Sequence, residues 1–345
     1  MPIRLEKLYP GKLDHSFLQE LLNRYTCRDD RVVQGAQVGE DATVIDMGDS
    51  YLVAKSDPIT FAAENIGKYA VYVNANDIAC MGATPKWFLA TILLPEHSTR
   101  SLAEKIFEEI AAVCGQEDIC YCGGHTEVTV SLDRPIVIGH MLGVVKKEKL
   151  LLKRNACCGD HLILANGIPI EATAIIAAHK QKELETSFSG DFVVKCKSLL
   201  DDPGISVLPS VRIAMSSCKI RAFHDPTEGG LATAVHEITM ATGLGAIIHY
   251  EKIPILTEAK LICDLLDLEP IGCISSGALI CIVPPKSVQS LLRAFSQHHI
   301  IAEEIGKLLA VEEGVTLMRG GIRQRLPIYP MDEVLKIFSS KKPAR

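Results

Sequence analysis

The sequence places acidic residues beside glycines at the ends of apolar runs, and this arrangement constrains the fold most. Residues 39–45 (Gly-Glu-Asp-Ala-Thr-Val-Ile) put Glu40 and Asp41 behind a glycine and directly ahead of a strand-like run. Further acids stand where later apolar runs begin or end, at Asp57, Asp77, Glu127 and Asp225. Several acidic strand ends are typical of a site where carboxylate oxygens hold Mg²⁺ that also contacts phosphates. Because Asp and Gly favour turns by themselves, residues 40–41 could instead form an exposed turn, and Asp57 could be a simple loop entry.

Residues 44–47 and 51–57 predict two strands joined by a turn at 48–50. Such a hairpin would bring Asp41 and Asp57 together. Residues 65–81 predict a helix with one apolar stripe, which ends at a Gly-Ala-Thr-Pro sequence. Asn74, Asn76 and Asp77 lie within this apolar helix, where burial is costly unless a partner satisfies them. That partner is either a bound ligand or a neighbouring loop that accepts and donates ordinary hydrogen bonds.

Further strands are predicted at residues 86–94, 118–122 and 135–145, with a helix from a capping box at 101–104 to about residue 114. Gly123 and Gly124 follow the middle strand, where missing side chains would let the backbone approach a ligand. These elements suit an α+β layer. The length of 345 residues favours two domains, 1–150 and 151–345, joined by charged residues 146–155 that we interpret as a solvated linker.

The second part of the chain also alternates predicted strands and helices. The strands are expected at residues 160–165, 220–224, 279–283 and 315–318, and the helices at 170–179, 210–217, 228–242 and 284–298. This pattern predicts a second α/β unit.

Composition excludes several classes of function. The formal net charge of −6 gives no basic field that would attract nucleic acid or acidic lipid, so a small-molecule substrate is favoured. No apolar stretch reaches the roughly 20 residues of a membrane helix. The 12 cysteines lie mostly in apolar runs, without zinc-binding spacing and without a secretory segment, which predicts reduced thiols and a cytoplasmic protein.

The sequence lacks both of the common glycine-rich loops that bind phosphate. The chain contains no Gly-x-x-x-x-Gly-Lys-Ser/Thr sequence and no Gly-x-Gly-x-x-Gly that opens a helix after a strand. The remaining way to bind phosphate is through Mg²⁺, which carboxylates hold in contact with the phosphate oxygens.

The ordered series of acidic motifs resembles the superfamily of aminoimidazole ribonucleotide synthetase, thiamine-monophosphate kinase, selenophosphate synthetase and the hydrogenase-maturation carbamoyl dehydratase. The resemblance runs from about residue 39 to about residue 320 and is closest to the last of these groups. It implies a two-domain α+β (PurM-like) fold, ATP and Mg²⁺ held between the domains, and a homodimer formed through the first domain. The implied metal ligands are Asp41, Asp57, Asp77 and Glu127. The implied cofactor-binding residues are Gly39, Glu40, Asn76, Gly123, Gly124, Thr126, Gly229 and Gly230, and the implied catalytic residues are Asp57, Asp225 and Thr227.

Three departures from the family pattern bear on the activity. His125 stands where relatives carry a carboxylate, and Glu228 stands where they usually carry an arginine. The last residues, 339–345, lack the cysteine-ended tail of the carbamoyl dehydratases, and we expect them to be mobile. The prediction is therefore an ATP- and Mg²⁺-dependent enzyme that phosphorylates an oxygen of a small molecule. The alternative is a non-catalytic nucleotide-binding partner protein in metallocofactor (hydrogenase) assembly.

Overall fold

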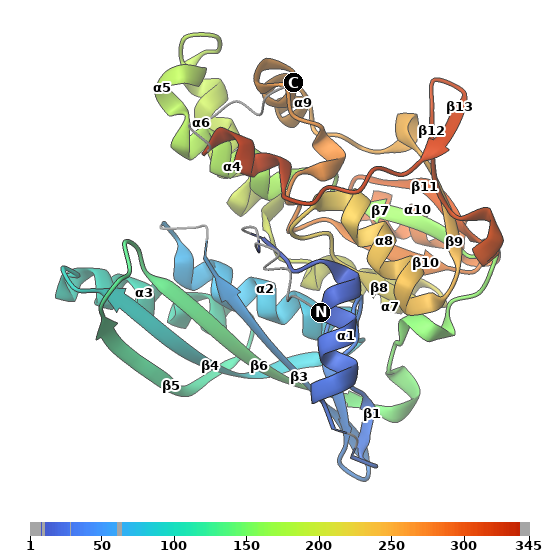
Figure 1. The fold of residues 1–345 in the computed structure, drawn as a ribbon, viewed down its shortest axis with the longest axis horizontal. Coiled ribbons are helices and arrows are strands. Elements are labelled where there is room, and N and C mark those ends of the chain that lie inside the picture. The colour runs from blue at the N-terminus through green and yellow to red at the C-terminus, as the bar shows by residue number, and fades with distance from the viewer. Residues whose placement is uncertain (1–7, 9–10, 28, 61–63, 339–345) are drawn as a thin grey trace, which may run out of the picture.

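The computed structural model describes residues 8, 11–27, 29–60 and 64–338, which form two β-sheets with helices packed on them (Figure 1). The two sheets belong to two domains, as the sequence predicts. The predicted mobile tail at residues 339–345 lies outside the described residues.

The first sheet has six strands in the order β1-β2-β3-β6-β4-β5. Helices α2 and α3 cover one of its faces, and α1 lies near the junction with the second domain (Figure 1). The predicted hairpin is present, because β2 and β3 pair antiparallel from Thr43↔Ala54 to Asp46↔Tyr51. The elements are α1 (His15–Tyr25), β1 (Val32–Gln34), β2 (Thr43–Asp46), β3 (Ser50–Ile59), α2 (Ile66–Cys80), β4 (Thr84–Pro95), α3 (Arg100–Gln116), β5 (Cys120–Thr129) and β6 (Ile136–Lys146).

Helix α2 is buried nearly all round, so the prediction of a single apolar stripe is wrong. The helix is enclosed because it packs on the first sheet and also contacts α7 and β8 of the second domain. Asn76 uses its amide to join the domains: Nδ2 donates to the Ile205 carbonyl at 2.8 Å, and Oδ1 accepts from the Val207 N–H at 2.9 Å. A neighbouring loop therefore satisfies Asn76, as one of the two sequence interpretations expected.

Two predicted boundaries differ in the structure. Helix α3 begins two residues earlier than predicted, because the Thr99 hydroxyl, rather than Ser101, accepts the capping hydrogen bond from the Leu102 N–H. Strand β5 does not end at Gly123 but continues through both glycines to Thr129. A Cβ at Gly124 would collide with the Ala90 carbonyl of β4, so close strand packing is the reason for this glycine.

The second sheet has seven strands in the order β13-β12-β9-β11-β7-β10-β8. All the strands and helices predicted for this region are present, whereas α5, α6, β9, α9, β11 and β13 were not predicted. The elements are β7 (His161–Ala165), α4 (Ile170–His179), α5 (Gln181–Leu184), α6 (Gly190–Ser198), α7 (Leu208–Ser217), β8 (Ala222–His224), α8 (Gly230–Thr242), β9 (Gly245–His249), α9 (Thr257–Leu266), β10 (Leu279–Val283), α10 (Val288–Gln297), β11 (Ala302–Leu309), β12 (Val315–Arg319) and β13 (Ile322–Arg325).

The two domains share one apolar core. Ile163 and Ala165 of β7 pack in the same cluster as the core of the first domain, while Leu162 and Leu164 face a second cluster that includes α8. Strands β7 and β10 are buried on both faces, which explains their continuous apolar sequences. The shared core holds the junction between the domains in a defined geometry.

In the part of the chain that the structure describes, no helix combines the length and the apolar character needed to cross a membrane.

Candidate functional site

Four predicted aspartates meet at the junction of the two domains. Asp41 precedes β2, Asp57 lies on β3, Asp77 lies on α2, and Asp225 follows β8 of the second domain. Asp41, Asp77 and Asp225 are buried, and the last two act on each other electrostatically. Oxygens of Asp41 and Asp225 and a ring nitrogen of His224 lie within 4.8 Å of one another. The fold thus brings together at one site acids that are as far apart in the sequence as Asp41 and Asp225, a separation of 184 positions.

Lys55 lies between two of these aspartates. Its Nζ is 2.8 Å from Asp77 Oδ2 and 3.4 Å from Asp57 Oδ2. Lys55 and Asp57 are two positions apart on β3, so their side chains leave the strand on the same face. Burial and the neighbouring aspartates disfavour the charged form of Asp77, and its pKa is raised well above the usual value although Lys55 opposes this.

Lys153 enters the site from the segment that we interpreted as a solvated linker, and that interpretation is wrong for this residue. Its side chain is 2% exposed, and Nζ lies 2.5 Å from Asp41 Oδ2 and 4.0 Å from Glu40 Oε2. The 3₁₀ turn Lys153–Asn155 carries the lysine to the junction. The pKa of Asp41 is lowered because Lys153 and His224 outweigh its burial.

His224 connects Asp41 to the second domain. Its Nδ1 is 2.8 Å from Asp41 Oδ1, and its Nε2 is 3.0 Å from Glu237 Oε2 on α8. Although burial alone would lower it, the pKa of His224 is raised to about 9 by Asp41 and by the two carboxylate hydrogen bonds. The ring is therefore an imidazolium at neutral pH, with both N–H groups engaged. Lys12 Nζ completes the chain of charges by donating to Glu237 Oε1 at 3.0 Å.

The oxygen ligands at this junction suit a magnesium ion. Asp225 Oδ2 is buried and has no hydrogen-bond partner, which leaves a carboxylate oxygen for a cation. Glu40 Oε2 is likewise buried without a hydrogen-bond partner. Carboxylate oxygens are the ligands that Mg²⁺ prefers, whereas protonated His224 has no lone pair to offer. The donor set therefore fits a hard divalent cation beside Asp41 and Asp225.

The predicted glycine sites are used in packing. A Cβ at Gly39 would collide with the Glu237 carbonyl of α8, so this glycine lets the acidic loop approach the second domain. The Gly229 N–H donates to Asp332 Oδ2 at 2.7 Å, and the Gly230 N–H donates to the Thr227 carbonyl at 2.9 Å. Asp332 and Thr227 thus bond the backbone of the two glycines that begin α8. Thr227 lies at the same turn and is partly buried.

Strand β5 does not reach the aspartates within one chain. Strand β5 lies three strands away from β3, roughly 14 Å across the sheet. The paired residues that connect the two strands are Asp57↔Gly139, Gly139↔Ala90 and Ala90↔Gly124. Thr126 and Glu127 are exposed on this edge strand with Gly123 and Gly124. Glu127 Oε2 is instead 3.0 Å from His125 Nε2. Glu127 therefore cannot share a metal ion with Asp57 in the same chain.

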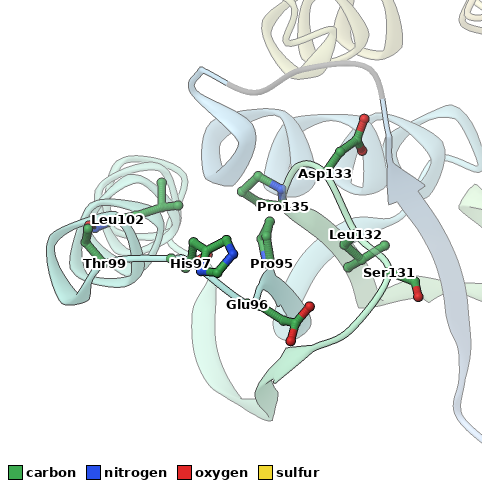
Figure 2. Close-up of a pocket in the computed structure, with 10 residues that line it drawn as sticks. Pro95, Glu96, His97, Thr99, Leu102, Ser131, Leu132, Asp133 and Pro135 are labelled. Carbon is green, nitrogen blue, oxygen red and sulfur yellow. The ribbon is translucent and has the colours of Figure 1, made fainter.

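A separate cavity of about 550 Å³ opens between the loop after β4 and the loop before β6 (Figure 2). Its lining includes Glu96, His97, Leu102 and Asp133, and none of the predicted site residues. The imidazole of His97 and the carboxylate of Glu96 are drawn beside Pro95 at this cavity (Figure 2). The four aspartates are thus not part of this cavity.

The sequence-based prediction missed the cations of the site, which are Lys55, Lys153, His224 and Lys12. Lys55 had a usable signal, because a residue two positions before Asp57 on a predicted strand must share its face. His224 also had one, since it precedes Asp225 at a strand end. Nothing in the local sequence distinguishes Lys153 from its solvated neighbours.

The fold and the site define a two-domain α+β protein with a buried carboxylate cluster at the domain junction. Residues 39–145 match the N-terminal domain, and residues 158–318 the C-terminal domain, of the AIR synthase related protein family. The chain belongs to this family and lies in its HypE-like branch.

Related proteins match this chain over most of their length. A putative hydrogenase expression/formation protein of Methanocaldococcus jannaschii is 28% identical over 290 residues, 82% of this chain and 83% of the relative. Carbamoyl dehydratase HypE of Bradyrhizobium diazoefficiens is 28% identical over 281 residues, 79% of this chain and 78% of the relative.

Solved structures show the same fold. Hydrogenase maturation protein HypE in complex with ATP has a TM-score of 0.70 and 19% identity, over 94% of this chain and 97% of that chain. The HypE–HypF complex gives a TM-score of 0.71 with 21% identity, over 85% of this chain and 94% of that chain.

Proposed function

We propose that this protein is an ATP- and Mg²⁺-dependent enzyme that phosphorylates, and thereby activates, an oxygen of a small-molecule substrate. The observation that carries the proposal is the convergence of Asp41, Asp57 and Asp77 with Asp225 of the other domain. A bound cation would stabilise the ionised form of buried carboxylates that have an unpartnered oxygen. A related structure solved with ATP, and the solved complex of AaThiL with AMPPCP and TMP, support a nucleotide as the ligand.

Asp41 and Asp225 would hold the Mg²⁺ ion, with Asp77 as a third acid nearby. When bound, Mg²⁺ neutralises phosphate charge and aligns an in-line transfer. Lys153 and His224 fix the orientation of Asp41, because each bonds one of its two oxygens. Asp57 is the more exposed acid, with 36% of its side chain accessible, and it is suited to contact the substrate. Asp225, carried by the second domain, makes metal binding depend on the closed junction.

The first test is metal-dependent nucleotide binding. Replacing Asp77 by Asn keeps the shape and removes the charge, and we expect it to weaken binding of Mg²⁺–ATP by tenfold or more, about 1.4 kcal/mol. Titration calorimetry of ATP with and without Mg²⁺ measures this. The matched control is Asp46→Asn, a partly exposed acid paired with Lys147. Unchanged affinity in Asp77→Asn would contradict the proposed role of the cluster.

We also propose a homodimer formed through the first sheet. On β4 and β6 most of the residues that face away from α2 and α3 are apolar and only partly buried or exposed. The apolar ones include Trp87, Leu89, Leu93, Ile138 and Leu142, and the polar residues Thr91 and His140 lie on the same face. An apolar face of this extent usually marks an interface between proteins.

A charge on this face should break the dimer. We expect Leu142→Glu to give a monomer in light scattering coupled to size-exclusion chromatography, because an interface does not tolerate a buried unpaired carboxylate. The control is Ile322→Glu, at a residue that is 69% exposed on the second domain. If Leu142→Glu and the parent chain have the same mass, this face is not the interface.

A second candidate function is a non-catalytic nucleotide-binding partner in hydrogenase assembly. His125 and Glu228, which depart from the family pattern, favour it, and a related HypE is solved in complex with HypF. ATP hydrolysis by the chain alone supports the enzyme. Hydrolysis only after addition of a HypF-like protein supports the partner function. A thermal-shift screen of metabolites with ATP and Mg²⁺ present would identify the acceptor.

A further inference from the structure

The site at the domain junction contains more carboxylates than one magnesium ion needs. Asp41 and Asp225 lie together with an unpartnered oxygen, and Asp57 and Asp77 form a second pair of acids. Two pairs of acids would ordinarily hold two divalent cations, as in many phosphoryl-transfer sites. The second pair differs, because a lysine ammonium already lies between its members.

Lys55 is placed there by the fold. It shares a face of β3 with Asp57, and α2 brings Asp77 to 2.8 Å from its Nζ. Asp57 lies on the other side of the ammonium group, with its Oδ2 at 3.4 Å from Nζ. The side chain of Lys55 is 22% exposed and that of Asp77 is 8% exposed, so solvent screens the pair weakly. A divalent cation that bridges Asp57 and Asp77 would need the space between their carboxylates, and the ammonium group of Lys55 fills that space.

We propose that the ammonium group of Lys55 takes the place of a second divalent cation between Asp57 and Asp77, so that this chain binds one Mg²⁺ at the junction. The inference rests on the proposed function and specifies its metal requirement. Lys55 is a positioning residue, because it orients Asp57 and Asp77 and sets the charge next to the phosphates. The single positive charge of the lysine, which cannot leave the protein, would replace the double charge of a metal ion that can exchange with solvent.

The charges of the other neighbours agree with this assignment. Nζ of Lys55 lies 2.8 Å from Asp77 Oδ2 and 3.4 Å from Asp57 Oδ2, so its charge faces both acids. Lys153 and His224 both contact Asp41 rather than the second pair. Among these three cations, Lys55 is thus the one that neutralises Asp57 and Asp77.

The test counts metal ions on the full-length chain without nucleotide. Mn²⁺ bound per chain is measured from the loss of the free-ion signal in electron paramagnetic resonance, in the parent and in Lys55→Met. We expect Lys55→Met to bind one more Mn²⁺ than the parent, since it frees two carboxylates without filling the space between them with charge. Lys55→Arg keeps the cation and should match the parent. The surface control Lys147→Met, which frees Asp46 alone, should also match the parent.

A thermal measurement covers the case in which Lys55→Met folds poorly without metal. Its melting temperature should then rise more with added Mn²⁺ than that of the parent, because a new site stabilises only the folded state. Equal Mn²⁺ counts and equal thermal responses in Lys55→Met and the parent would overturn the inference. A different result would show that the proposed function is wrong. In that case the parent chain would bind no ATP in the presence of Mg²⁺, whether or not the Mn²⁺ counts of the two proteins differ.

Discussion

Replacing Lys153 by methionine should lower the free energy of unfolding by about 3–5 kcal/mol, the usual cost of removing one partner of a buried ion pair. Methionine fills much of the volume but leaves Asp41 and Glu40 without their shared cation. Both carboxylates are at most 5% exposed, so water does not replace the lost charge. Urea denaturation followed by circular dichroism measures the loss.

The matched control is Lys147→Met, because that lysine bonds Asp46 at the surface and is 40% exposed. It should change stability by no more than about 1 kcal/mol. The double variant Lys153→Met with Asp41→Asn should recover part of the loss, since the two residues contact each other. A loss of less than 1 kcal/mol in Lys153→Met would show that the pair is solvated in solution.

Stability should fall as pH rises from about 4.5 to about 7, because of Glu171. Burial raises the pKa of this carboxyl from 4.5 to about 7, and its Oε2 has no hydrogen-bond partner. Between these values the folded protein holds the proton and the unfolded chain releases it, so each step upward in pH favours unfolding. The shift corresponds to about 3 kcal/mol, which is present below pH 4.5 and lost above pH 7.

The variant Glu171→Gln should remove this component of the pH dependence and be more stable than the parent at pH 8. Glutamine keeps the shape of the side chain and, without ionising, retains an oxygen that accepts from Ser276. The comparison is urea denaturation of both proteins at pH 5 and pH 8. Glu183→Gln is the control, because its carboxylate is 52% exposed. A parallel pH profile for Glu171→Gln and the parent would mean that Glu171 is ionised in the folded protein.

Local sequence patterns were sufficient for most of the elements and for part of the site. The alternating and helical periodicities predicted most strands and helices of the first domain, though not β1, since each pattern follows from its own backbone geometry. The acids Asp41, Asp57 and Asp225 were found because carboxylates at strand ends are unusual unless a ligand meets them. Asp77 was found because an ionised group in an apolar helix is costly.

The missed elements are about as long as those that were predicted. Strand β11 has 8 residues and helix α9 has 10, as many as α4, α7 and α10. Local propensity is a weak guide in such segments, because tertiary packing overrides it. The continuation of β5 through Gly123 and Gly124 was also missed, because glycine normally weakens a strand. Here the close approach of Ala90 on β4 requires it.

The sequence by itself predicted the two-domain α+β fold, which the family match confirms, and the order of the acidic motifs. Only the tertiary structure decided which positively charged side chain contacts which acid. Lys153 reaches Asp41 across 112 positions and His224 across 183, distances at which no periodic pattern carries information. It also decided that the glycines at 39, 229 and 230 serve packing, because a close approach depends on the chain that comes near. Buried charges are arranged by three-dimensional proximity, since Coulomb energy depends on distance in space and not on separation in the sequence.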